Sequence, residues 1–146
     1  MHKLIGKQRL YNVNFPGQDV VQWDVLDIKQ EQQLILTFLS TNSSYRQGVR
    51  LAVDAGDGYI EINSIDYGKA VQLWFDTCPS ELPIKCISSE GVLSVYNIFE
   101  DRCVNSQLDS CGMLIDSDSD TFTYRCNDEG FVSNFDKLVF SIKLVK

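Results

Sequence analysis

The chain has 146 residues, a length that fits one domain with its own hydrophobic core, and its net charge is −7 with an isoelectric point near 4.6. With 20 acidic and 13 basic residues it has little with which to neutralise phosphates, so nucleic acid is not an expected partner. No segment approaches the roughly 20 apolar residues of a membrane-spanning helix, and the first residues lack the apolar run of a secretion signal. We therefore expect a cytoplasmic protein with no membrane partner.

From the N-terminus onward, apolar and polar residues alternate with a period of two, which is typical of half-buried strands. Turn-forming residues separate these runs at short intervals, as in an antiparallel sandwich or barrel rather than in alternating strands and helices. We therefore predict a single, mainly β domain over residues 1–146. The predicted strands are 4–13, 20–28, 34–39, 50–53, 59–62, 70–75, 84–88, 92–99, 121–126 and 137–144.

Three of these segments carry more specific predictions. The segment 34–39 is apolar on both faces and should be a central strand. The segments 50–53 and 59–62 flank a glycine-rich turn and should pair as a β-hairpin. Segment 98–111 has helical spacing of apolar residues behind a possible cap at Asn97, so a short helix and an extended conformation are both open there.

The net negative charge is concentrated in one segment, from Glu100 to Asp136, which holds two bases, Arg102 and Arg125. The rest of the chain is balanced, with eleven acids and eleven bases. A dense field of one sign speeds encounter with a partner of opposite sign, so this segment is predicted to bind a basic protein domain. Its nine acids are Glu100, Asp101, Asp109, Asp116, Asp118, Asp120, Asp128, Glu129 and Asp136.

Within this segment, Asp116, Asp118 and Asp120 have the spacing of the first three ligands of an EF-hand calcium loop. The sixth position of that loop requires glycine and the twelfth requires glutamate, but this chain has Thr121 and Asn127 there. An irregular calcium site, a solvated loop and a protein-docking loop remain as alternatives. We expect no metal and no cofactor.

Few residues offer catalytic chemistry. The only histidine is His2, near the terminus, and no nucleophile elbow, phosphate loop or dinucleotide fingerprint occurs, so no catalytic residue is predicted and the chain is not expected to be an enzyme. The five cysteines are odd in number and lack zinc spacing, so their thiols should be free. Cys86 and Cys126 continue apolar alternation and should lie in the core.

Two aromatic residues are candidate anchors for a partner. Trp74 shares strand parity with Gln72 and Asp76, so it is predicted to project from the polar face of its strand, although burial there is an alternative. Tyr124 lies in the acidic segment and is the second candidate. Large aromatic side chains dominate binding energy when they enter a desolvated pocket of the partner.

In size, acidity, β content and lack of catalytic groups, the whole chain resembles the immunity proteins of contact-dependent growth inhibition and related polymorphic toxin systems in bacteria. The resemblance is one of type, without a diagnostic motif. It implies a cytoplasmic inhibitor that covers the active site or substrate cleft of a basic toxin domain, above all a nuclease of the RNase kind. A carbohydrate- or calcium-binding β-sandwich module and a structural subunit of a larger assembly are the alternatives.

Overall fold

The computed structural model describes residues 8–54, 57–108, 110–129 and 134–146, and these residues form strands and loops without a helix. The prediction of a mainly β, antiparallel fold is confirmed. The strands are β1 (Leu10–Tyr11), β2 (Val21–Asp27), β3 (Glu31–Thr41), β4 (Arg46–Val53), β5 (Tyr59–Ile62), β6 (Ile65–Asp66), β7 (Ala70–Trp74), β8 (Glu81–Ile87), β9 (Val92–Asp101), β10 (Cys103–Asn105), β11 (Gly112–Asp118), β12 (Thr121–Asn127) and β13 (Leu138–Val145).

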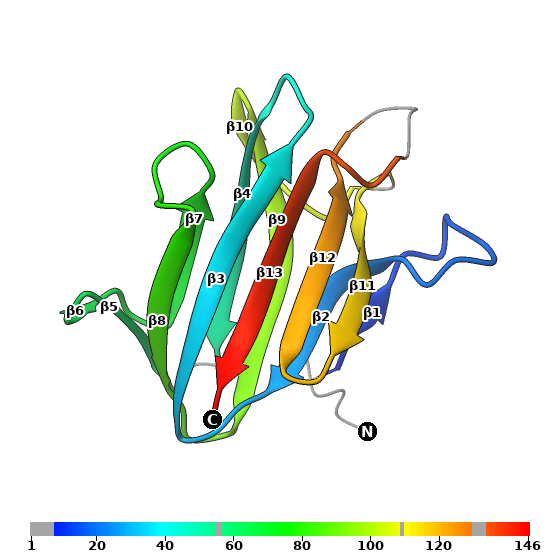
Figure 1. Ribbon diagram of the computed structural model, residues 1–146. Helices are drawn as coiled ribbons and strands as arrows, with labels where there is room; N and C mark the ends of the chain where they lie inside the picture. The colour runs from blue at the N-terminus through cyan, green and yellow to red at the C-terminus, as the bar shows by residue number, and fades with distance from the viewer. Residues whose placement is uncertain (1–7, 55–56, 109, 130–133) are drawn as a thin grey trace.

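These strands form one continuous antiparallel sheet that curls into a half-barrel (Figure 1). The order of the strands is β6-β5-β8-β3-β13-β12-β11-β2-β9-β4-β7, with β1 added to β2 and β10 added to β9. The most extensive pairings join β3 to β13 and β4 to β9, strands far apart in the sequence. Long-range pairing therefore defines the fold, as is usual for sandwiches and barrels.

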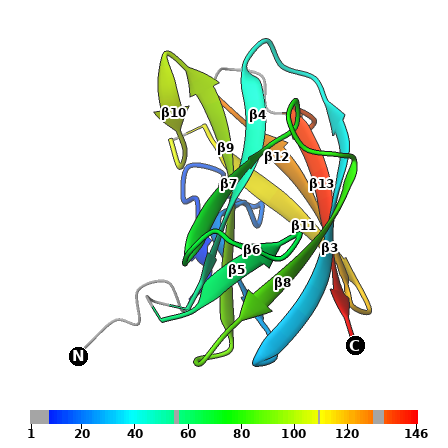
Figure 2. The same ribbon diagram turned by 90° about the vertical axis from the view of Figure 1, so that its left-hand side faces the viewer.

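The curled sheet presents two layers that face each other across the core (Figure 2). One layer contains β8, β3, β13, β12 and β11, and the other contains β9, β4 and β7. Strand β2 belongs to both, because its first half pairs with β1 and β11 while its second half pairs with β9. The turn from one layer to the other therefore occurs within β2.

The core consists of the inward-facing residues of both layers. Along β13, Leu138, Phe140 and Ile142 are fully buried, and Phe140 stacks on Tyr124 of β12 with ring centroids 4.6 Å apart. Cys86 and Cys126 are fully buried within the same core, as predicted. Burial raises the pKa of the Cys86 thiol to about 12, so this thiol stays protonated and behaves as a small apolar group.

Buried Asp24 stands where β2 changes layers. Its side chain is inaccessible to solvent and accepts two hydrogen bonds, 2.7 Å from Nε of Arg9 and 2.6 Å from the hydroxyl of Tyr124. Burial, followed by the Asp24 charge, raises the pKa of Tyr124 well above its ordinary value, so the phenol remains a donor. A cation and a phenol thus satisfy a carboxylate that would otherwise be costly to bury.

The structure decides three points about single segments. Of the two conformations left open for segment 98–111, its described residues take the extended one, because residues up to Asp101 continue β9 and Cys103–Asn105 fold back on it as β10. Strands β4 and β5 do not pair with each other, because the chain crosses between the layers after Val53. Strand β3 is central, between β8 and β13, but only one of its faces is covered. On the other face Leu39 is 54% exposed.

The crossing after β4 is fixed by Asp54, which is 6% exposed and has a positive φ of 54°. Its carboxylate accepts hydrogen bonds from the hydroxyl groups of Ser88 and Ser89 and from backbone N–H groups of the turn before β9. Burial alone would raise the pKa of Asp54, but these hydrogen bonds outweigh it, and the pKa is lower than the ordinary 3.8. Asp54 therefore stabilises the fold in its charged form.

We predict that Asp54→Ala lowers the free energy of unfolding by about 3 kcal/mol at pH 7, because it leaves buried N–H and hydroxyl donors without an acceptor. Since the folded pKa is depressed, this contribution is complete above the ordinary pKa and disappears as the pH falls through the folded value. Denaturant titrations of both proteins at several pH values measure the difference. The matched control is Asp57→Ala at an exposed position; equal effects of the two substitutions would contradict this role.

Candidate functional site

The structure divides the acidic segment between two ends of the molecule. Strands β11 and β12 run along the sheet, with Asp116, Asp118 and Asp120 at one end and Asp128 and Glu129 at the other. The seven residues of β12 span roughly 20 Å at about 3.3 Å per residue. The acids of residues 100–136 therefore lie in two separate groups rather than in one continuous patch.

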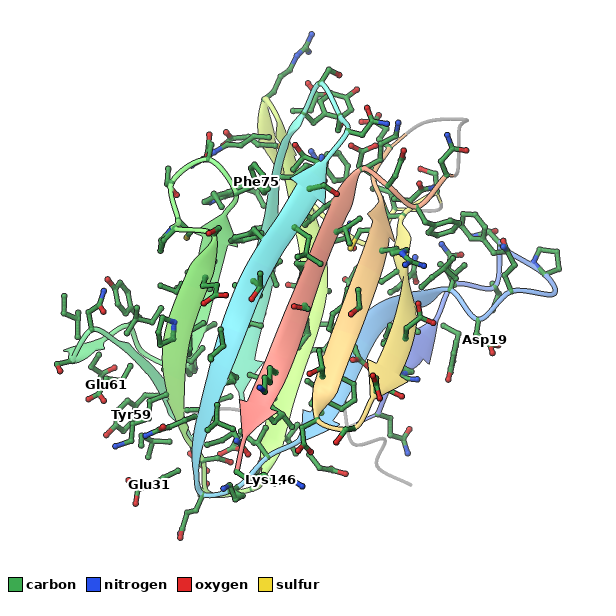
Figure 3. All side chains as sticks on the ribbon, viewed as in Figure 1. Asp19, Glu31, Tyr59, Glu61, Phe75 and Lys146 are labelled. Carbon is green, nitrogen blue, oxygen red and sulfur yellow. The ribbon has the colours of Figure 1, made fainter. Side chains whose placement is uncertain are left out.

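The first group surrounds the tight turn between β11 and β12, where Ser119 adopts a positive φ of 57°. Two of its acids have cationic neighbours: Asp116 is 3.4 Å from Arg125, and Asp120 is 3.3 Å from Lys146. Lys146 lies at the opposite end of the molecule from Phe75 (Figure 3). The EF-hand-like spacing thus corresponds to a β-hairpin, and no cluster of metal-binding side chains occurs in the described part of the chain.

The second group, which we call the acidic end, consists of Glu100, Asp101, Asp128, Glu129 and Asp136. The loop between β3 and β4 lies among these acids. Asn42 donates a hydrogen bond to Asp136 over 2.8 Å, and Ser43 donates one to Asp128. The tilted ring of Tyr45 packs against Phe99 in β9, which places it beside the last acids of that strand.

A hollow of about 400 Å³ lies at this end, and we call it the acidic hollow. Its lining residues are Asn42, Ser43, Ser44, Tyr45, Asp128, Glu129 and Lys137. A second hollow, of about 440 Å³, lies on the outer face of β3, β5 and β8 and is lined by both Glu61 and Lys85. Of these two hollows, the acidic one has the greater concentration of one charge, with Asp128 and Glu129 in its lining.

Asp128 is held in the hollow by a network of buried amides. Asn97 of β9 donates to the carbonyl of Asn127 over 2.9 Å, which fixes the end of β12. Gln47 of β4 then donates to the Asp128 carboxylate over 2.8 Å. Asp128 is 3% exposed, and none of the ion pairs between described residues includes it. Among the described residues, the side chains that donate to this nearly buried carboxylate are thus neutral.

Tyr45 reports the potential at this end. The charges of Glu129, Asp101 and Asp128 all raise the pKa of its phenol, with Glu129 the largest contributor. Negative neighbours disfavour the charged phenolate, which explains the direction. Three acids from β9 and from the end of β12 therefore act on one side chain of the loop between β3 and β4.

Arg46, at the start of β4, is a cation at the edge of the acidic end. It contacts Asp76 over 2.9 Å and Glu100 over 3.6 Å, and its guanidinium lies 4.3 Å from the centre of the Trp74 ring. Trp74 can approach β4 closely because its partner in the ladder is Gly48, where a side chain would collide with the ring. A cation over an aromatic face adds to this packing.

The two predicted aromatic anchors are therefore not presented to a partner. Tyr124 is fully buried against Phe140, and Trp74 is 9% exposed beneath Arg46. Trp74 does lie on the outer face predicted from its strand parity, but it is covered there. Asp109, another predicted contact, lies outside the described residues.

Sequence reasoning missed the residues that connect the acids. The loop with Ser43 and Tyr45 is neutral, so a count of charge gives no reason to choose it. Phe75 is also at this end, where it is 36% exposed and its N–H donates to Gln47 (Figure 3). The exposed aromatic is thus the neighbour of the predicted Trp74. The only signal in the sequence was that Trp74 and Phe75 are adjacent, and this does not show which of the two rings is covered.

Comparisons of the chain with protein-family models, with curated proteins and with solved structures found no match. Among the described residues there is also no helix with the length and apolarity that crossing a membrane requires.

We predict that the phenol of Tyr45 titrates above its ordinary pKa of 10.0 and that Glu129→Gln moves this pKa back toward that value, because the largest unfavourable charge is removed. A pH titration followed by NMR or by tyrosine absorbance, with Tyr45→Phe to assign the signal, measures this. Asp118→Asn, at the other end of β12, is the matched control and should leave the titration unchanged. An equal shift in both variants would refute the described geometry.

Proposed function

We propose that this chain is an immunity protein of the polymorphic toxin type, which binds a basic toxin domain, above all an RNase, through the acidic end and thereby neutralises it. The observation that carries the proposal is the gathering of acids from two separate parts of the chain around one loop, where Asp101, Asp128 and Glu129 all act on Tyr45. In this proposal the protein is not an enzyme and acts in the cytoplasm.

The chemistry of the proposed partner follows from its substrate. An enzyme that cleaves RNA needs a positively charged cleft for the phosphates, and carboxylates on a complementary surface can occupy the same positions. Complementary charge accelerates encounter and excludes wrong partners, whereas affinity depends on a few desolvated contacts. Partly exposed Phe75 and Tyr45 are the aromatic candidates for such contacts here.

The acidic end supports this role better than the hairpin between β11 and β12. In the hairpin, Asp116 and Asp120 already have cationic neighbours, so less of their charge is free to attract a partner. At the acidic end, Asp101 and Glu129 are exposed and belong to none of the ion pairs formed between described residues. The acidic end therefore replaces the hairpin as the proposed docking surface.

The proposal is tested with the toxin domain encoded by the gene immediately upstream of this chain. Expression of that domain alone should stop growth of a host cell, and coexpression of this chain should restore growth through a complex that survives copurification. A neighbouring gene for polysaccharide metabolism, or a complex that leaves the toxin fully active, would refute the immunity role.

A pair of charge variants locates the surface. We predict that Asp101→Asn with Glu129→Gln slows association with the toxin domain roughly three- to tenfold at low salt and weakens its salt dependence, because steering charge is lost. Asp116→Asn with Asp118→Asn removes the same charge from the other end and should change the rate little. Stopped-flow or surface-binding kinetics at several salt concentrations measure both. A larger effect from the second pair would move the docking surface to the hairpin.

A further inference from the structure

The acidic hollow has hydrogen-bonding capacity that the protein itself does not use. Among the described residues, three buried side-chain polar atoms lack a hydrogen-bond partner, and two of them belong to residues directly behind the lining of this hollow: Oε1 of Gln47 and Oδ1 of Asp136. The Gln47 amide is bonded to Asp128, and the Asp136 carboxylate is bonded to Asn42; both partners line the hollow. Both atoms are acceptors, so the residues behind the lining have acceptor capacity that the described part of the chain leaves unused.

The charge of Asp128 points the same way. Its carboxylate is nearly inaccessible, yet Ser43 and Gln47, its hydrogen-bond donors among the described residues, are neutral. A buried charge without a counter-charge is costly, and the cost is relieved when a cation that carries hydrogen-bond donors arrives. Lys137 also lines the hollow, but its ammonium forms no ion pair with Asp128 or with any other described residue.

We propose that the acidic hollow is a receptor for the cationic head of one lysine or arginine side chain of the partner, held by the carboxylate of Asp128 with Glu129 at the rim. This inference rests on the proposed function for the identity of the partner. It adds a single anchor to the general attraction between charged surfaces. The inserted group supplies Asp128 with the counter-charge and the charged N–H donors that it does not receive from any described residue, whereas a neutral side chain of the same length supplies neither.

In this proposal, buried Asp128 and the exposed acids contribute to binding in different ways. Exposed Asp101 and Glu129 attract a partner over a distance but are screened by salt. A desolvated charge pair resists screening, and losing one member of such a pair mainly speeds dissociation. The exposed acids therefore govern the association rate, and Asp128 governs the lifetime of the complex.

The probes for the test are the blocked single amino acids N-acetyl-lysine methylamide and N-acetyl-arginine methylamide, with N-acetyl-norleucine methylamide as the neutral control. They are titrated into the full chain and followed by NMR. We expect saturable shifts centred on Ser43, Tyr45, Asp128 and Glu129 with at least one cationic probe and none with norleucine. The tighter cationic probe identifies the preferred head group.

The variant Asp128→Asn keeps the size of the side chain and should weaken binding of the cationic probe at least roughly tenfold. Its melting temperature should equal or exceed that of the parent, because an uncompensated buried charge is removed; a merely structural Asp128 would give a clear loss instead. Glu129→Gln is the second variant, at an exposed position, and should also weaken binding. Asp118→Asn is the matched control and should bind as the parent does.

Unsaturable shifts, shifts spread equally over both acidic groups, or unchanged binding by Asp128→Asn and Glu129→Gln would overturn the inference. The proposed function fails separately. If the cationic probes bind in the hollow but the chain does not protect cells from the upstream toxin domain, only the immunity role is lost. If the chain neutralises the toxin and no cationic probe binds, only the receptor role of the hollow is lost.

Discussion

The layered structure depends on a single strand, β2, which takes part in both layers and is held at the change by buried Asp24. Without this strand the sheet would have no connection between β11 and β9. The hydrogen bonds from Arg9 and Tyr124 offset the free-energy cost of burying this carboxylate. A second link between the layers is the hydrogen bond from the amide of Asn97, within β9, to the carbonyl of Asn127, at the end of β12.

The two acidic groups differ in how their charges are placed. At the hairpin the acids project into solvent, and Arg125 and Lys146 lie beside two of them. The repulsion among these acids is therefore small. At the acidic end the fold holds Asp128 inside and places Glu129 and Asp101 near the same loop. Repulsion there is a cost to the free protein. A binding partner that supplies positive charge relieves this repulsion, so the same arrangement favours binding. Such a loss of stability in return for function is common.

Much of the fold could be predicted from the sequence because strand periodicity is local. The alternation of Leu138, Phe140 and Ile142 defines the inner face of β13, and that face is buried as expected. Pairing is not local, and the glycine-rich connection after Val53 is compatible with a hairpin or with a crossing between layers. The crossing is determined by Asp54, whose hydrogen-bond partners around Ser88 lie more than thirty residues further along the sequence.

The candidate site was predictable only in part, for a related reason. The sum of charge over a segment identifies the right acids but takes no account of strand direction, which sends Asp118 and Asp128 to opposite ends of β12. Parity correctly places Trp74 on an outer face, but it carries no information about Gly48 or Arg46, which cover the ring. The neutral loop with Tyr45 gains its importance solely from tertiary contacts.

The central claim is that the acidic end, and not the hairpin, is the surface that meets a basic toxin domain. Hydrogen–deuterium exchange of the full chain, with and without the upstream-encoded domain, tests it most directly, because it reads the whole surface without a substitution. The account predicts slower exchange on binding at residues 42–47, 99–102 and 127–129, with little change at 116–121. Protection centred on 116–121 with the loop around Tyr45 unaffected would contradict it.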